Sequence, residues 1–433
     1  MTIRIAFTED QFQPLVSALG DKDETAAVAT TSLVEVAATA TIPTTTKADI
    51  TLLTQAIAAI PETAYLERGP MGLTISSVGW VPSFRAAVAA NQIPLFVHTH
   101  PGGEAKFSTY DDQVDRDLAT VAQAFGANYY VAVVIAGTLD SPQAAARLYS
   151  LGGDFNAIAP TFTVVDAIRV TGSSMRLYLP PADSADDQSE LTEENTSVFD
   201  RQVRMLGPEG DRTLKQVRAA IIGAGGTGTA VGVQIARLGL GEVVLVDDDV
   251  VTDPTPTRGH GTTRADIGRP KVDVLGDHLD AIGLGTKITK VNQPLNGREA
   301  IAAIAHMDVI FSCVDGHGAR LLLNRWAYAH ISPVIDVAVL VTPIETGSGR
   351  KAEIEQRVTW VAPGAACPPL PRTGRPRPGV RRAPRPRDPK AAGRRRLRAG
   401  RRDPAARGRH PHHQRRGARR YGVPASPDRP RTG

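Results

Sequence analysis

The spacing of apolar residues changes along the chain and marks out a first region, residues 1–179. There, short apolar runs that suit strands alternate with apolar positions three and four apart, the spacing of amphipathic helices. This alternation predicts a mixed α/β domain. The expected strands are residues 2–7, 25–40, 73–81, 95–98 and 129–136, and the expected helices are residues 12–19, 50–60 and 110–126.

A second region with a more regular alternation follows a polar stretch. Residues 180–198 are acidic and almost free of large apolar side chains, so they cannot bury enough surface to order themselves and are interpreted as a linker. In residues 199–367, apolar runs alternate with helical patterns, which predicts a mainly parallel sheet with crossover helices. The runs expected to form strands are residues 219–222, 243–246, 309–311 and 334–341.

Length and composition are those of a globular enzyme with more than one domain. The 433 residues suggest two or three domains, with 42% hydrophobic and 22% charged residues. Two cysteines exclude a disulfide-stapled secreted scaffold. No apolar stretch approaches the roughly 20 residues of a membrane span, and residues 1–10 lack a signal-peptide core. We therefore expect a cytoplasmic protein without a membrane partner.

The net charge of +5 combines two pieces of opposite sign. Residues 368–433 hold 21 Arg and 1 Lys against 3 Asp, a net +19, which leaves −14 for the other 367 residues. This tail has almost no apolar residues and is predicted to be disordered. Because the basic charge belongs to the tail alone, we do not expect nucleic acid to be the partner of the folded domains.

A cluster of potential metal ligands follows the strand expected at residues 95–98. His98 and His100 are two residues apart, so their side chains point to the same side of a strand. Ser108 comes next, and Asp111 lies in the first turn of an expected helix that can direct a carboxylate to the same point. Two His and one Asp leave the fourth position of a tetrahedral zinc open, which is the catalytic arrangement.

The spacing H-x-H-x7-S-x2-D resembles that of the JAMM (JAB/MPN) metallopeptidases, which cut isopeptide or peptide bonds after ubiquitin-like proteins. The resemblance covers roughly residues 1–150 and implies a zinc ion held by His98, His100 and Asp111. It also implies a glutamate that acts as general base on the zinc water. Glu24 fits that place, and Glu35 is the second candidate. Ser108 would stabilise the tetrahedral oxyanion.

A simpler interpretation of the histidines competes with this one. Two histidines on a strand more often serve packing or the surface than a metal. The serine and aspartate at fixed spacing favour zinc, and a binding fold without catalysis stays open as an alternative.

A glycine-rich turn joins the run at residues 219–222 to a helical pattern. Its glycines permit a tight turn and let backbone N–H groups approach phosphate at a helix N-terminus. Asp247 ends the next expected strand, where it suits ribose hydroxyls. These features alone would also suit a dehydrogenase. The glycines are Gly223, Gly225, Gly226 and Gly228.

The motifs that flank the glycine-rich turn argue against a dehydrogenase. FDRQVRMLGPEGDRTLKQVRAAIIGAGGTG, GEVVLVDDDVV, IGRPK and MDVIFSCVDGHGARLLLN together resemble the adenylating domain of ubiquitin-activating and ThiF/MoeB-like enzymes. The resemblance covers about residues 199–341 and implies a Rossmann-like domain that binds ATP and Mg²⁺. A surface salt bridge is the competing interpretation for each charged residue of these motifs.

The same resemblance assigns roles to individual residues. Asp247 would hold the ribose, with Asp249 at the second acidic position of that loop. Arg258 and Lys271 would neutralise the phosphates, and Asp315 would lie near Mg²⁺. Arg201 would reach the nucleotide of a second protomer, which implies a homodimer. Thr255 stands where this family has asparagine, which would weaken ATP binding.

The two cysteines do not offer a nucleophile. Cys313 lies within an apolar strand, as a buried small hydrophobe. Cys367 resembles the first residue of a C-x2-C pair that binds structural zinc in such proteins, but Leu370 occupies the second position.

Three interpretations of residues 368–433 compete. They form a basic arm for anionic surfaces, an appendage without a specific role, or the product of a reading frame that slips near Cys367. The third is favoured, because the resemblance stops there and Arg, Pro, Gly and Ala are what GC-rich DNA encodes out of frame.

The sequence as a whole predicts a fusion of a zinc (iso)peptidase domain with an ATP-dependent adenylating domain. The shared partner would be a ubiquitin-like or sulfur-carrier β-grasp protein in a prokaryotic conjugation or defence system. The first domain would trim this protein and the second would activate its C-terminal glycine. Sulfur-carrier activation in cofactor or amino-acid biosynthesis and a non-catalytic binding scaffold remain the alternatives.

Overall fold

The computed structural model describes residues 2–35, 49–152, 161–181, 198–346 and 349–365. Contacts divide the chain into Met1–Pro369 and Leu370–Gly433. The predictions for most of the linker, for the basic tail and for Cys367 therefore lie outside the described residues. No helix within the described ranges combines the length and the apolar character that crossing a membrane requires.

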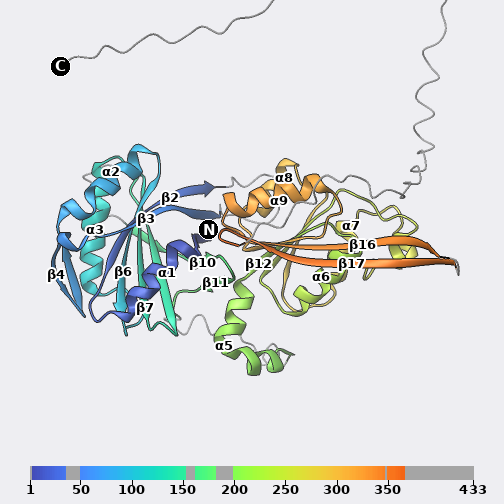
Figure 1. Ribbon diagram of the computed structural model, residues 1–433, viewed down its shortest axis with the longest axis horizontal. Coiled ribbons are helices and arrows are strands. Elements are labelled where there is room, and N and C mark those ends of the chain that lie inside the picture. Colours follow the sequence, from blue (N-terminus) through green and yellow to red (C-terminus); the bar gives the residue numbers. More distant parts are fainter. Residues whose placement is uncertain (1, 36–48, 153–160, 182–197, 347–348, 366–433) are drawn as a thin grey trace, which may run out of the picture. The chain divides into compact units, whose positions relative to one another are not determined.

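The N-terminal region folds around a mixed nine-stranded sheet (Figure 1). The strand order is β11-β10-β1-β3-β2-β6-β7-β8-β9. A separate hairpin is formed by β4 (Tyr65–Gly69) and β5 (Gly72–Ile75). The nine strands are β1 (Ile3–Thr8), β2 (Ala26–Glu35), β3 (Ile50–Ala59), β6 (Ile93–Pro101), β7 (Tyr129–Gly137), β8 (Pro142–Ser150), β9 (Thr161–Val164), β10 (Ala167–Thr171) and β11 (Met175–Tyr178).

Helices pack on both faces of this sheet. On one face, α1 (Glu9–Ser17) buries Phe12, Leu15 and Val16 against alternate residues of the central strands. On the other face lie α2 (Val81–Ala89) and α3 (Thr109–Ala124), in one core cluster with Phe96 of β6. Because side chains alternate along a strand, His98 and His100 share the face of Phe96, the face that α3 covers.

The structure corrects two sequence-based expectations for this region. Residues 50–60 were expected to be helical, but Ile50–Ala59 form β3 between β1 and β2. The spacing of Ala and Leu in this segment fits both the helical and the strand period. The first five residues of β3 are all buried, as in a strand covered on both faces. Residues 73–81 were expected to be one strand, but β5 ends at Ile75 and α2 begins at Val81. Pro82, at the start of α2, is the signal that marks this helix.

The second region is a doubly wound, Rossmann-like sheet with the order β14-β13-β12-β15-β16-β17. All neighbouring pairs are parallel except β16 and β17, so the prediction of a mainly parallel sheet is confirmed. The strands are β12 (Arg218–Ile222), β13 (Glu242–Val246), β14 (Lys287–Val291), β15 (Val309–Ser312), β16 (Val334–Thr346) and β17 (Gly349–Val361). The helices are α5 (Asp200–Gln216), α6 (Gly226–Arg237), α7 (Lys271–Asp280), α8 (Arg298–Ile304) and α9 (His317–Ala329).

The strand order reverses between β12 and β15, and this reversal defines where a ligand can enter. From β12 the chain proceeds outward through β13 to β14, and it then returns to the other side of β12 with β15. At such a point the loops after the two strands diverge and leave a crevice at the carboxyl end of the sheet. The glycine turn after β12 and the loops after β13 and β15 all lie at this end.

Candidate active sites

The two histidines lie at the end of β6, where it pairs in parallel with β7. His98 pairs with Val134 and His100 with Ala136 in that register. His98 is buried and His100 half-buried. Both therefore stand at the carboxyl end of a parallel strand pair, with α3 crossing over between the two strands.

The start of α3 fixes the position of the aspartate. Ser108 is the N-cap, and its hydroxyl oxygen accepts a hydrogen bond from the Asp111 backbone at 3.2 Å. Asp111 Oδ2 in turn accepts from the Ser108 backbone N at 2.6 Å and from its hydroxyl at 2.7 Å, which completes a capping box. The S-x2-D spacing is therefore a helix start that directs the Asp111 carboxylate towards the histidines.

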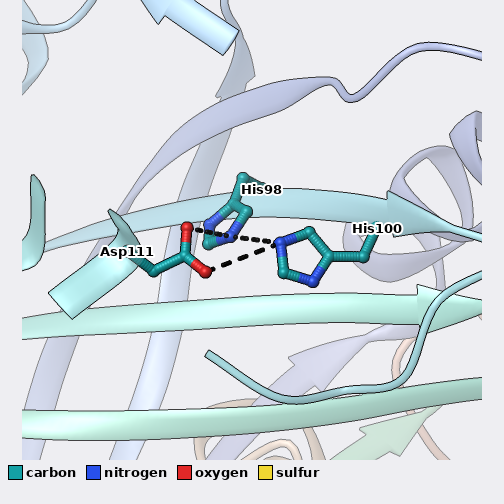
Figure 2. Close-up of side chains that lie close together, drawn as sticks. All are labelled: His98, His100 and Asp111. Atoms are coloured by element: carbon teal, nitrogen blue, oxygen red, sulfur yellow. Dashed lines mark hydrogen bonds and ion pairs between the residues drawn. The ribbon is translucent and has the colours of Figure 1, made fainter. Parts of the chain in front are cut away.

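Three potential ligand atoms converge at this place. Figure 2 shows the His98, His100 and Asp111 side chains turned towards one another. The two Nε2 atoms are 3.1 Å apart, and Asp111 lies 3.2 Å from His98 Nε2 and 3.7 Å from His100 Nε2. One ligand atom of each residue lies within 4.8 Å of the others, a spacing that suits one metal ion. Two imidazoles and a carboxylate are the donor types that zinc takes in open sites.

Glu24 lies beside these three residues. It stands just before β2, is buried, and has Oε1 3.9 Å from His100 Nε2. Burial raises the pKa of its carboxyl group, and the nearby charge of His98 opposes that effect. Glu35, the second candidate for the general base, ends β2 at the opposite end from Ala26, which pairs with His98. Of the two glutamates, the structure brings Glu24 to the histidines.

The protonation of the other groups also suits a cation. Burial lowers the pKa of His100, assisted by the neighbouring His98, which favours the neutral imidazole that binds metals. Burial would raise the pKa of Asp111, but hydrogen bonds from His98 and Ser108 outweigh it and hold that pKa well below its usual range. Asp111 is therefore a carboxylate at neutral pH.

A cavity of about 500 Å³ opens onto these residues. Its lining includes Glu24, both histidines, Ser108 and Asp111, together with apolar side chains such as Phe96 and Phe107. Asp115 also lines it, a residue that lies outside the H-x-H-x7-S-x2-D motif. The available signal was its position four residues after Asp111, on the same face of α3.

The glycine turn after β12 depends on two positions in particular. Gly223 has φ of +96°, a left-handed conformation that L side chains rarely adopt. A Cβ on Gly228, in the first turn of α6, would lie 1.8 Å from the Gly223 carbonyl oxygen. Gly225 is the N-cap of α6 and Gly226 its first residue, so the N–H groups of the first turn of α6 lie at this end of the sheet.

Asp247 follows β13 and is tied to the glycine turn. Its Oδ2 accepts from the Ala224 backbone N at 2.6 Å and its Oδ1 from the Asp249 backbone N at 2.8 Å. Burial raises the pKa of Asp247, opposed by these hydrogen bonds and by the charge of Lys271. These hydrogen bonds fix the Asp247 carboxylate at the end of β13, and its predicted role in ribose binding stays a prediction.

Lys271, the first residue of α7, completes a charged group at this end of the sheet. Its Nζ lies 2.6 Å from Asp249 Oδ2 and 3.9 Å from Asp247 Oδ1. The carboxylates of Asp247, Asp248 and Asp249 also lie within 4.8 Å of one another. The structure therefore brings together three of the predicted nucleotide-binding residues, Asp247, Asp249 and Lys271.

The remaining charged residues predicted for this site are solvent-exposed. Arg258 follows the short helix Thr255–Thr257, and its backbone and side chain lie against Gly226, within 3.6 Å of the position that a Cβ would take. Asp315 follows β15 and is exposed, and Arg201 is exposed on α5. Thr255 is buried, and its hydroxyl oxygen accepts from the Thr252 backbone N at 3.0 Å, so it braces this loop.

Cys313 is a poor nucleophile. Burial, with the nearby charge of Asp336, raises the pKa of its thiol to about 12. The thiolate, which is the reactive form, is therefore scarce at neutral pH.

A doubly wound sheet with a glycine turn and an acidic residue after the next strand is the architecture of nucleotide-binding domains. Residues 199–367 match the model of the ThiF family. Molybdopterin-synthase adenylyltransferase of Escherichia coli is 32% identical over 154 residues, which cover 35% of this chain and 62% of that protein. Sulfur carrier protein ThiS adenylyltransferase of the same organism is 31% identical over 163 residues, with 35% and 65% covered.

A probable adenylyltransferase/sulfurtransferase MoeZ of Mycobacterium tuberculosis is 30% identical over 191 residues, which cover 43% of this chain and 45% of that protein. The chain thus spans less than two thirds of the length of each of these relatives. These matches identify residues 199–367 as a ThiF domain with adenylyltransferase homologues.

Gly228→Ala tests the glycine turn. Alanine is normally favoured over glycine within a helix by about 1 kcal/mol, but here its Cβ meets the Gly223 carbonyl. We expect a net loss of about 1–3 kcal/mol in the free energy of unfolding, measured by urea titration. Gly225→Ala is the matched control, because nothing lies within 4 Å of its Cβ position. Equal stability of the two variants would contradict the close approach.

Proposed function

We propose that the ThiF domain adenylates the C-terminal glycine of a ubiquitin-like or sulfur-carrier β-grasp protein. The observation that carries this proposal is the group of Asp247, Asp249 and Lys271 at the carboxyl end of β13, beside the glycine turn. The names of the relatives support the reaction type, since they are adenylyltransferases of molybdopterin synthase and of the sulfur carrier ThiS.

Different residues of the chain bind different parts of ATP and Mg²⁺. The N–H groups at the start of α6 face the phosphates, and Asp247 accepts hydrogen bonds from the ribose hydroxyls. Lys271 releases Asp249 and pairs with phosphate oxygens, which leaves the Asp249 carboxylate for Mg²⁺, together with Asp315. The carrier carboxylate then attacks the α-phosphorus, and pyrophosphate leaves. Arg258 and Lys271 offset the negative charge that develops.

Exposed residues of the domain suit partners in trans. Arg201 on α5 is free to reach the nucleotide of a second protomer in a homodimer. A ubiquitin-like carrier in a prokaryotic conjugation or defence system and a sulfur carrier for cofactor or amino-acid biosynthesis present the same C-terminal glycine. Measuring ATP:pyrophosphate exchange with each kind of carrier in turn distinguishes these two possible partners.

Lys271→Ala tests adenylation. We expect ATP:pyrophosphate exchange that depends on a carrier ending in Gly-Gly, and a loss of about 10²-fold in the variant, because a charge that stabilises the phosphates is removed. Lys290→Ala is the control, since Lys290 lies on β14 and pairs with Asp277 at 2.7 Å.

Two outcomes would contradict the adenylation proposal. Exchange unaffected by Lys271→Ala would exclude the assigned phosphate contact. No exchange and no ATP binding by the folded wild type would favour a non-catalytic scaffold, with Thr255 in place of asparagine as a candidate cause.

A second activity is supported by the convergence of His98, His100 and Asp111 in a cavity that also holds Glu24. We propose that this region is a JAMM-type zinc (iso)peptidase that trims or releases the same carrier. The residues fit zinc, because two imidazole nitrogens and a carboxylate lie close together, and burial lowers the pKa of His100 and so favours its neutral form. When bound, zinc supplies a Lewis acid that polarises the scissile carbonyl.

The other residues of this site move protons and orient the substrate. The Glu24 carboxylate takes the proton of the attacking water, and its raised pKa makes it a better base near neutral pH. It then returns that proton to the leaving amine. The Ser108 hydroxyl, which donates to Asp111 at 2.7 Å, exchanges partners and stabilises the developing oxyanion.

Glu24→Gln tests the hydrolytic activity. We expect the rate of cleavage of a C-terminally extended carrier to fall by about 10²–10⁴-fold while zinc content stays near one ion per chain, because glutamine cannot accept the proton. Mass spectrometry measures both the cleavage and the metal stoichiometry. Glu67→Gln, at an exposed position on β4, is the control. Full activity of Glu24→Gln would exclude Glu24 as the base.

A further inference from the structure

The backbone of Glu24, the proposed general base, lies outside the main sheet. Glu24 precedes β2, which begins at Ala26, so the strand ladder does not hold the residue that carries the base. A catalytic group that is misplaced by about 1 Å can lose about 10²-fold in rate. The groups that hold the Glu24 backbone therefore matter for the reaction.

The β4–β5 hairpin supplies these groups. The Glu24 backbone N donates to the Gly69 carbonyl at 2.9 Å, and the Glu24 carbonyl accepts from Arg68 Nε at 2.9 Å. The Tyr65 hydroxyl accepts from the Ala26 backbone N at 2.9 Å. Three residues of β4 thus hold the short segment that carries the base.

The residue after Glu24 is attached to the histidine strand instead. The Thr25 backbone N donates to Thr99 Oγ1 at 2.9 Å, and the Thr99 backbone N donates to the Thr25 carbonyl at 2.9 Å. Thr99 is buried and stands between the two histidines on β6. The segment is therefore fixed to β6 on one side and to the hairpin on the other. We expect loss of the hairpin contact to move Glu24 relative to the histidines.

The Arg68 side chain is itself held in place. Its Nη1 lies 3.0 Å from Glu62 Oε2, and its guanidinium carbon lies 5.1 Å from the centre of the Tyr65 ring. The Arg68 side chain is only 23% exposed, whereas that of Glu62 is 79% exposed. Exposed ion pairs contribute little because water and salt screen them. The hydrogen bond to Glu24 is therefore the Arg68 contact that we expect to affect the site.

A role in the shape of the hairpin is the competing explanation for Arg68. Residues 70–73, at the tip of the hairpin, line the histidine cavity. A change in the shape of the hairpin would therefore alter substrate binding and raise KM. Displacement of the base would instead lower kcat, because Glu24 acts on the reacting water. The two explanations thus differ in which kinetic constant changes.

We propose that Arg68 is a positioning residue of the histidine site: its Nε–H holds the Glu24 carbonyl and thereby keeps the Glu24 carboxylate within reach of the attacking water. Arg68 is not among the residues that line the cavity, so zinc binding does not depend on it. This inference rests on the proposed zinc (iso)peptidase activity.

The test compares Arg68→Met with Arg68→Gln in the full chain. Both replacements are neutral, keep a side chain of similar length and lose the ion pair with Glu62. They differ in the donor, because glutamine carries an amide N–H on Cδ, where arginine carries Nε, and methionine has none. Glu62→Gln is the control for the ion pair. The substrate is a β-grasp carrier with a short extension beyond Gly-Gly, and kcat, KM and zinc content are measured.

We expect Arg68→Met to lower kcat by about 10–100-fold, with KM within about threefold of the wild type and zinc content unchanged. Arg68→Gln and Glu62→Gln should keep kcat within about threefold of the wild type. Because Arg68 acts through Glu24, Arg68→Met should cause no further loss in the Glu24→Gln variant.

Several outcomes would overturn the assignment. A wild-type kcat in Arg68→Met would do so, as would a change confined to KM. An equal loss in Arg68→Gln or in Glu62→Gln would assign the effect to the ion pair. Arg68→Leu, which also lacks a donor, replaces Arg68→Met if that variant folds poorly. A wild type that binds zinc but cuts no extended carrier would overturn the peptidase proposal, and this inference with it.

Discussion

Both candidate sites form where a parallel strand ends and the next helix begins. Where such a strand stops, its last backbone groups leave the ladder and the next helix begins with unpaired N–H groups. β6, α3 and β7 form one such unit, and β12, α6 and β13 form another. In the first unit the helix start holds Asp111 against two histidines at the strand end. In the second it leaves N–H groups free beside Asp247.

The same geometry brings carboxylates close together, and the two sites offset the repulsion between these groups in different ways. Asp111, Asp115 and Glu24 line one cavity, where burial raises the pKa of Asp115 to about 6 and also raises that of Glu24. Only Asp111 stays strongly acidic, because His98 and Ser108 donate to it. In the ThiF domain the backbone donates to Asp247, and Lys271 balances Asp249. Each site holds an excess of carboxylates, and a bound cation would reduce the repulsion between them.

Local patterns made the grouping of the two histidines with Asp111 predictable, whereas contacts between distant parts of the chain could not be predicted. The H-x-H spacing places both histidines on one face of a strand, and S-x2-D is a capping box, so both are legible in the sequence. The surroundings of Asp115 include Tyr130 and Arg147, which come from β7 and β8 and which no local motif announces. The same limit explains β3, whose Ala- and Leu-rich sequence resembles a helix until its place between β1 and β2 is known. In the ThiF domain, the turn and Asp247 were predictable, but the pairing of Lys271 with Asp249 was not.

The central claim is that the two sites of this chain act in sequence on one carrier protein. It is tested most directly by following acyl-adenylate formation, by intact mass, on a carrier with a short extension beyond Gly-Gly and on the mature carrier, each with zinc and with a chelator. The account predicts that the mature carrier is adenylated in both conditions, and that the extended carrier is adenylated only with zinc, after it has been shortened. An extended carrier that stays uncut and unadenylated with zinc present, while the mature form reacts, would contradict the coupling of the two sites.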